Sequence, residues 1–249
     1  MADRRVLLLV GIVLGLALLP ALAGCAEVEA DEPSAIDESN DSVGEEPATE
    51  EGEEAGAEEP PAPKLPKPVV VRGSGKKVAT VRLKRDGPVV ITGRHRGSAN
   101  FIVHLVGQGI EEYIFNEIGT YNGQAAIAEG VAGRYRMPVE ADGSWTVRFE
   151  HPVPTGNERS LLGTHKGQGA KVLRLRIDEA AQPIFRAKHR GQANFIVHLI
   201  GYGDVTGEMS LFNEIGSFSG EALAESELPG GTYLMWVQAD GRWTIRVAP

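Results

Sequence analysis

The feature that most constrains this chain is the segment His95–Leu105, HRGSANFIVHL, because it returns at His189–Leu199 as HRGQANFIVHL. The two copies begin 94 residues apart. A spacing of this size is the length of a small domain. The repeat therefore predicts two modules that share one fold, each built around its own copy of the segment.

The similarity between the copies extends to both sides of this segment. Matching stretches pair Gly73–Leu83 with Gly167–Ile177, Phe115–Gly123 with Phe212–Gly220, and Val139–Val147 with Val237–Ile245. We therefore predict modules at residues 69–151 and 163–249, joined by a linker at 152–162. The second copy is a few residues longer near Tyr202–Gly207, and such insertions belong in surface loops.

Apolar and polar residues alternate along both modules, and no segment has convincing helical spacing. In Trp145–Phe149 every second residue is apolar, which is typical of a half-buried strand. The pairs Asp142-Gly143 and Asp240-Gly241 lie between two such segments and predict tight hairpins, because both residue types tolerate positive φ. Short strands separated by glycine-rich turns favour an antiparallel sandwich. We therefore expect an all-β chain with two tandem, jelly-roll-like β-sandwiches.

The end of each module carries a recognisable pattern. It reads Gly133-x-Tyr135, then Val139-x-Ala141-x-Gly143-x-Trp145, and it is repeated from Gly231 to Trp243. This pattern is distantly similar to the prepeptidase C-terminal-type domains that are appended to exported bacterial enzymes. The resemblance implies a noncatalytic β-sandwich with a binding or accessory role.

The N-terminus reads as an export signal. Arg4 and Arg5 precede an uncharged apolar run at Val6–Ala23, which is followed by Gly24 and Cys25. A basic start, a short apolar core and small residues before a boundary are typical of a secretory signal rather than a spanning helix. We therefore expect a signal peptide at residues 1–24.

The sequence Leu22-Ala23-Gly24-Cys25 resembles the lipobox of bacterial lipoproteins. The resemblance implies that Cys25 becomes the new N-terminus and carries acyl chains such as palmitate, and stable anchoring needs more than one such chain. Cys25 is the chain's one cysteine, so no thiol remains for disulfides or metal ligation. We expect a lipid-anchored protein of the cell envelope, on the extracytoplasmic side of a bacterial membrane.

Residues 25–68 have a different composition. Ala26–Pro63 contains fifteen acidic residues and no lysine or arginine, and the stretch ends in a proline-rich segment. Such a composition predicts a disordered, self-repelling tether. From Lys64 onward there are 23 basic and 18 acidic residues, a net charge of +5. This charge can draw the modules toward anionic envelope polymers or lipid headgroups, or it can serve solubility alone.

Several polar residues recur in both copies: His95, His104 and Asn100 in the first, and His189, His198 and Asn194 in the second. Two histidines and a carboxylate would suit zinc if they converged, but no spacing here requires it and no HExxH or EF-hand motif is present. We expect no metal and no cofactor. We take these six residues as candidate binding residues. The alternative is a structural role, in which backbone hydrogen bonds explain the histidines and Asx-type turns explain the asparagines.

One difference between the copies is informative. Pro138 aligns with Trp236, at a position that faces away from the core. Proline there predicts a sheet edge or a bulge in the first module. In the second module, Trp236 beside Leu234 suits stacking on a sugar or insertion into a partner's pocket. The alternative is that Trp236 is buried because module 1 packs on module 2.

The chain has no Gly-x-Ser-x-Gly elbow, no free cysteine nucleophile and no phosphate-binding glycine loop. We therefore expect no enzymatic activity, and we expect no nucleic-acid partner. The favoured hypothesis is a lipid-anchored envelope protein whose two modules bind a protein or a cell-wall glycan. The alternatives are a structural spacer without a ligand and an unrecognised hydrolase. An exposed groove of aromatic and polar residues at Trp236 would favour binding.

Overall fold

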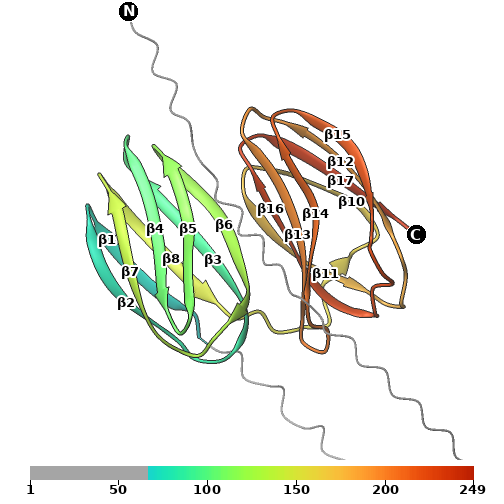
Figure 1. The fold of residues 1–249 in the computed structure, drawn as a ribbon, viewed down its shortest axis with the longest axis horizontal. Helices are drawn as coiled ribbons and strands as arrows, with labels where there is room; N and C mark the ends of the chain where they lie inside the picture. The colour runs from blue at the N-terminus through green and yellow to red at the C-terminus, as the bar shows by residue number, and fades with distance from the viewer. Residues whose placement is uncertain (1–66) are drawn as a thin grey trace, which may run out of the picture. The chain divides into compact units, whose positions relative to one another are not determined.

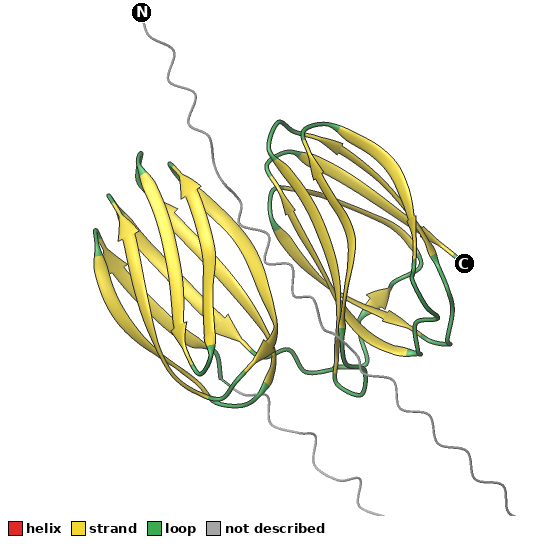
Figure 2. Ribbon diagram, in the orientation of Figure 1, coloured by secondary structure: helices red, strands yellow, loops and turns green. Residues whose placement is uncertain are grey.

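The computed structural model describes residues 67–249, and within this range the regular structure consists of strands (Figure 2). No helix that could cross a membrane occurs between residues 67 and 249. The signal peptide, Cys25 and nearly all of the acidic tether lie outside the described residues, so those interpretations stay predictions.

The first sandwich has eight strands in two antiparallel sheets, whose orders are β1-β8-β3-β6 and β2-β7-β4-β5 (Figure 1). The strands are β1 (Val69–Ser74), β2 (Lys77–Leu83), β3 (Gly87–Arg96), β4 (Asn100–Gly107), β5 (Ile110–Ile118), β6 (Tyr121–Gly130), β7 (Gly133–Ala141) and β8 (Ser144–Glu150). Except between β4 and β5, the chain changes sheet at every connection. This is the strand order of a jelly roll.

The second sandwich repeats this arrangement in sheets of order β10-β17-β12-β15 and β14-β13-β16-β11-β9. Its strands are β9 (Arg159–Ser160), β10 (Gly163–Gln168), β11 (Lys171–Ile177), β12 (Ile184–Arg190), β13 (Asn194–Tyr202), β14 (Glu208–Ile215), β15 (Phe218–Leu223), β16 (Gly231–Ala239) and β17 (Arg242–Ala248). The all-β, tandem-sandwich fold predicted from the sequence is confirmed.

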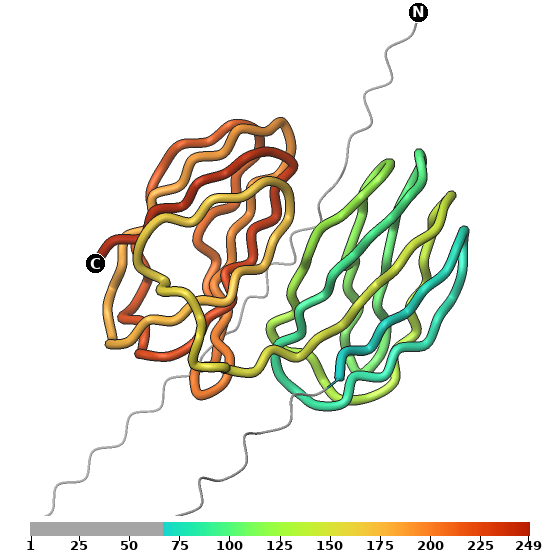
Figure 3. The backbone as a smooth tube through the Cα atoms, turned by 180° about the vertical axis from the view of Figure 1, so that it is seen from behind, coloured from blue at the N-terminus to red at the C-terminus, as the bar shows by residue number. Residues whose placement is uncertain are grey.

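The connection between the sandwiches is shorter than the predicted linker at 152–162. Strand β9 pairs in parallel with β11 and has no counterpart in the first sandwich. Leu161, directly after it, is fully buried in the second core. The second sandwich therefore begins at Arg159, and the crossing segment runs from His151 to Glu158 (Figure 3).

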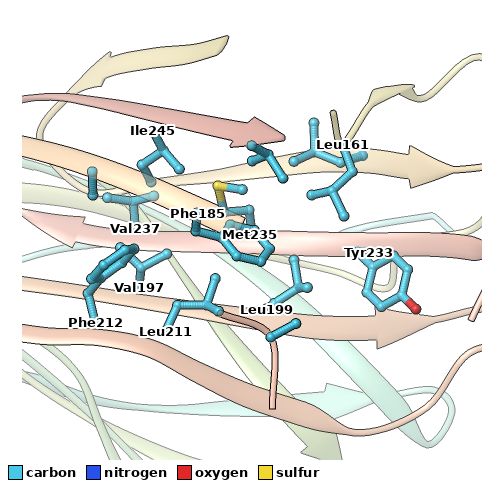
Figure 4. Close-up of a cluster of buried hydrophobic side chains, with 14 of the residues drawn as sticks. Leu161, Phe185, Val197, Leu199, Leu211, Phe212, Tyr233, Met235, Val237 and Ile245 are labelled. Atoms are coloured by element: carbon cyan, nitrogen blue, oxygen red, sulfur yellow. The ribbon is translucent and has the colours of Figure 1, made fainter. Parts of the chain in front are cut away.

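Each sandwich has its own core, formed by the inward-facing side chains of its two sheets. In the second sandwich Phe185 and Ile245 come from one sheet and Val197, Leu211 and Met235 from the other (Figure 4). Alternate residues along each strand enter this core, which is why the sequence shows a period of two. The residues between them form the outer faces of the sheets, where a binding site can be built.

In both sandwiches a core tryptophan is hydrogen-bonded to one glycine and packs closely against another glycine two residues earlier. The indole Nε1 of Trp145 donates to the carbonyl of Gly75 over 3.0 Å, and Trp243 does the same to Gly169. A Cβ added to Gly73 would lie 2.3 Å from the Trp145 ring. The repeated glycine is therefore explained by the close approach of the indole.

The predicted effect of Pro138 is partly wrong. Strand β7, which contains it, lies between β2 and β4 and is an interior strand rather than a sheet edge. The pairing of β7 with β4 stops after Val103–Val139 and resumes at Val106–Arg136. Proline has no N–H to donate, so the sheet accepts it by a local break in the ladder. In the second sandwich the ladder is continuous through Trp236.

The two sandwiches contact each other through a third apolar cluster. Val90 and Ala126 of the first pack against Ile200, Tyr202 and Leu234 of the second. These residues lie on the outer faces of two sheets, and their burial explains why those faces are apolar here. The expected packing of module 1 on module 2 is therefore present.

Polar contacts surround this cluster. The Gln124 backbone N–H donates to the Ala170 carbonyl over 3.1 Å, and the Gln124 side chain accepts from Val172 N–H over 3.1 Å. Arg174 pairs with Glu150 across the same contact. Backbone groups that the packing would otherwise leave unpaired are thus satisfied.

Candidate functional site

The first repeated histidine of each module has a structural role. His95 and His189 are buried, and each donates from Nδ1 to a glycine carbonyl, Gly119 or Gly216, over 2.7 Å. The His95 ring stacks on Phe101 with centroids 4.9 Å apart. The expectation that backbone hydrogen bonds hold these two histidines is confirmed.

Asp142, predicted as a hairpin residue, also holds a second turn. Its carboxylate accepts from the backbone N–H groups of Ser98 and Ala99 over 2.8 and 3.0 Å, and its other oxygen lies 3.2 Å from His95 Nε2. The Ser98 N–H, foremost among these contacts, lowers the pKa of Asp142 to about 2. Asp240 has the same position, bonding Gln192 N–H and lying 3.3 Å from His189.

Asn100 and Asn194 are exposed and begin strands β4 and β13. Each is paired across the sheet with an isoleucine, Ile118 or Ile215, whose exposed fraction is 80%. The Asx-type turns expected of these asparagines stay a prediction. Asn100 lies at the start of β4, away from the turn that joins β4 to β5 at residues 108–109.

The second repeated histidines lie on outer sheet faces, and each stacks on an aromatic ring. His104 stacks on Tyr113 with centroids 4.3 Å apart and an interplanar angle of 1°, and His198 stacks on Trp236 at 5.3 Å. Each also lies near a glutamate. His104 Nε2 is 3.7 Å from Glu111, and His198 Nδ1 is 2.8 Å from Glu208.

These aromatic residues and glutamates meet in one groove of about 560 Å³ between the sandwiches. Strands β5 and β6 form one side, and Trp236 and Glu208 contribute from the second sandwich. The lining contains two aromatic rings, Tyr113 and Trp236, and four carboxylates, those of Glu111, Glu112, Glu129 and Glu208. The structure therefore brings Trp236, His104 and His198 to one region and leaves His95, His189, Asn100 and Asn194 outside it.

Trp236 is both packed against the first sandwich and available to a ligand, so both interpretations of its position hold in part. It is half-buried, because it packs against the first sandwich, and it also lines the groove. Its Nε1 is buried without a hydrogen-bond acceptor among the described residues, so the ring face rather than the N–H is what Trp236 can offer to a ligand. Leu234, its predicted companion, is fully buried in the contact between the sandwiches. It therefore offers no surface to a ligand.

Tyr113 is the groove residue that sequence reasoning missed. It is 67% exposed, and the equivalent position in the second copy is Ser210. Because the tyrosine is not repeated, the similarity between the two copies does not point to it. The period of two could not have found it, because Phe115, two residues later, faces inward and is buried. A β-bulge opposite Val103 and His104 shifts the register and turns Tyr113 to the outer face, beside His104.

Metal coordination has no support from the side chains. Among residues 67–249, no group of three or more histidine, cysteine, aspartate or glutamate side chains is placed to hold an ion. The histidines of the groove are each paired with one glutamate instead.

The site and the fold define a pair of jelly-roll β-sandwich domains that share a groove. No family model and no curated protein matches the chain. Solved structures with some likeness include an allantoicase, at 8% identity and a TM-score of 0.26 over 69% of this chain and 77% of the other.

Two further solved structures have a similar degree of likeness. The tandem CBM22-1-CBM22-2 domains of Paenibacillus barcinonensis Xyn10C match at 8% identity and a TM-score of 0.24, over 72% and 91% of the chains. The stem and receptor binding domain of spike protein P1 from bacteriophage PM2 matches at 8% and 0.19, over 74% and 97%. At these values the likenesses carry no argument about function.

Proposed function

We propose that this chain is a lipid-anchored bacterial envelope protein whose paired sandwiches bind a glycan in the groove at Trp236. The observation that carries the proposal is the lining of that groove. Two aromatic rings from different sandwiches, Tyr113 and Trp236, face the same hollow as four glutamate carboxylates.

This lining suits the chemistry of a sugar. Aromatic rings pack against the apolar C–H faces of a pyranose, and carboxylates accept hydrogen bonds from its hydroxyl groups. Ligand pockets of about 300–1,000 Å³ are usual, and a small number of well-placed polar groups provides their specificity. The groove at about 560 Å³ would hold a short stretch of a glycan chain.

The histidine stacks support the same proposal, because they fix the orientation of the rings that a ligand would contact. His104 lies behind Tyr113 and His198 beside Trp236, and each histidine is also held by a glutamate. A ring that is already oriented loses less conformational entropy on binding. The anchor at Cys25 and the absence of enzymatic activity stay predictions from the sequence.

The proposal is tested with the purified full chain in detergent and isolated cell-wall glycan, by a cosedimentation isotherm. Tyr113→Ala removes a largely exposed ring, and Trp236→Leu removes the indole while it retains apolar volume against the first sandwich. Each is expected to weaken binding roughly tenfold or more, where a tenfold change corresponds to about 1.4 kcal/mol.

The matched control is Ile118→Ala, which truncates an exposed apolar residue outside the groove and should leave the isotherm unchanged. If the wild-type chain retains no glycan, or if Tyr113→Ala binds as tightly as wild type, the groove is not a glycan site. The spacer hypothesis would then be favoured.

A further inference from the structure

The outer face of the sheet β10-β17-β12-β15 is strongly basic. We call it the β17 face, and it carries six exposed cations: Lys166, Arg186, Lys188, Arg190, Arg242 and Arg246. They alternate with core residues such as Ala187 and Ile245, so all six project from the same side of the sheet. Glu221 is the acidic residue of this face and pairs with Arg186 over 2.9 Å.

The cations are placed directly against one another. Arg186 is the cross-strand partner of Arg246, and Arg190 is the partner of Arg242. Like charges directly opposite each other destabilise a sheet. Folding therefore gives no reason for this arrangement.

The first sandwich shows that the fold does not require it. There the two positions that match Arg186 and Arg242 are Thr92 and Ser144, each opposite a single arginine. The duplicated sheet thus folds without either like-charge pair. The additional arginines therefore make this face more basic than the matching face of the first sandwich.

The β17 face is also hollowed. A concavity of about 650 Å³ lies over it, lined by four of the cations together with the hydroxyl groups of Thr164, Ser219 and Thr244. Closely spaced cations around a concave surface concentrate the positive potential there. Hydroxyl groups between them can both donate and accept hydrogen bonds.

We propose that the β17 face binds an anionic polysaccharide, through its carboxylate, sulfate or phosphate groups. The complementary charges supply attraction, arginine forks bind such groups in bidentate fashion, and the hydroxyls bond the sugar ring. This site is separate from the groove at Trp236 and does not depend on it, since its lining residues all belong to the second sandwich.

The shape of the face favours a polymer over a lipid surface. A bilayer is flat on this scale and cannot enter a concavity, whereas a glycan chain can lie in it. The apolar residues of the face, Ile184 and Leu223, sit at one end, paired with each other. They do not form the rim that would insert among lipids.

The test is a titration of the purified full chain with polygalacturonate, a carboxylate polymer, with neutral dextran and phosphatidylglycerol vesicles as the other probes. The informative variant is Arg186→Thr/Arg242→Ser, which installs the residues of the first sandwich. We expect wild type to bind polygalacturonate, more weakly as salt rises, and the variant to lose at least tenfold in affinity.

The charge-matched control is Arg82→Thr/Arg134→Ser, which removes an opposed pair of exposed arginines from β2 and β7 of the first sandwich. It should bind like wild type. If both variants lost the same affinity for polygalacturonate, binding would depend on net charge alone, and the proposal would be overturned. It would also be overturned by binding to dextran that matches polygalacturonate, or by a loss of vesicle binding in Arg186→Thr/Arg242→Ser that exceeds its loss of polygalacturonate binding. Melting temperatures of both variants verify that each is folded.

Discussion

Asp142 and Asp240 show how a single side chain can join parts of a sandwich that are distant in sequence. Each belongs to a hairpin, bonds the backbone before β4 or β13, and lies against a buried histidine. Gly97 is required at the same place, because a Cβ there would lie 2.1 Å from the Asp142 carboxylate. The histidine and the glycine of the repeated HRG motif are therefore explained by one structural corner rather than by a ligand.

This corner predicts a loss of stability in acid. The pKa of Asp142 is lowered to about 2, first by the Ser98 N–H, so the folded state binds fewer protons than the unfolded state. The stabilisation is complete above the unfolded pKa of about 3.8 and disappears as the pH falls through about 2. Asp142→Asn should melt below wild type at pH 5, and the gap should narrow toward pH 2.

Melting curves followed by circular dichroism between pH 5 and pH 2 would measure this gap. Asp178→Asn serves as the control, because Asp178 is largely exposed and its carboxylate lies 3.0 Å from Nε of Arg176. A gap for Asp142→Asn that stays constant over this range would contradict the assigned role of the carboxylate.

The glycine beside each core tryptophan gives a second prediction at this scale. In Gly167→Ala the new Cβ would lie 2.2 Å from the Trp243 ring, so the indole or the strand must move. Overpacking of this kind typically costs about 1–3 kcal/mol. Urea denaturation should show this decrease in the free energy of unfolding, whereas Gln168→Ala, on the exposed side of the same strand, should change it little.

At the scale of strands and sheets, the two copies differ most at β7 and β16. Arg136 and Pro138 of β7 correspond to Leu234 and Trp236 of β16, through their equivalent pairings with β2 and β11. The same backbone thus carries an exposed, polar outer face in one sandwich and an apolar, covered face in the other. The contact between the sandwiches depends on this exchange.

Leu234→Arg tests that dependence, because arginine already occupies the equivalent position of the first sandwich. A buried, unpaired charge is strongly unfavourable, so the sandwiches should separate while each keeps its own core. Cleavage by a protease in His151–Glu158 should accelerate, and calorimetry should show two unfolding transitions. Val78→Arg, a change at an exposed site, should have neither effect. If calorimetry showed a single unfolding transition for Leu234→Arg at the wild-type temperature, the contact would be unimportant for stability.

How far the sequence predicts this molecule also becomes clear at this scale. Alternation and the Asp-Gly turns predict the strands correctly, because burial on one face determines both. The groove could not be predicted in the same way. Tyr113 and Trp236 each occur in one copy only, and they meet through a contact between sandwiches that no local pattern encodes. Duplication therefore indicates what the fold needs, and the unmatched residues indicate where a ligand would bind.

At the scale of the whole chain, the lipid anchor is one of the sequence expectations that stay predictions. Cys25→Ser removes the thiol that would carry the acyl chains, so the protein should move from the membrane fraction to the soluble fraction and lose labelling by a palmitate analogue. Ala26→Gly, at the next residue, should keep both properties. Membrane retention of an unlabelled Cys25→Ser protein would refute acyl anchoring.

The contact between the sandwiches joins two different surfaces, and such a head-to-tail arrangement is in principle open-ended. Ile184 and Leu223 of the second sandwich occupy the positions of Val90 and Ala126, so they could receive a third repeat. Another copy of the chain would present Arg136 there instead of leucine, facing the arginines of β12 and β17. The exchange of Leu234 and Trp236 for Arg136 and Pro138 would thus stop the contact from repeating beyond one pair.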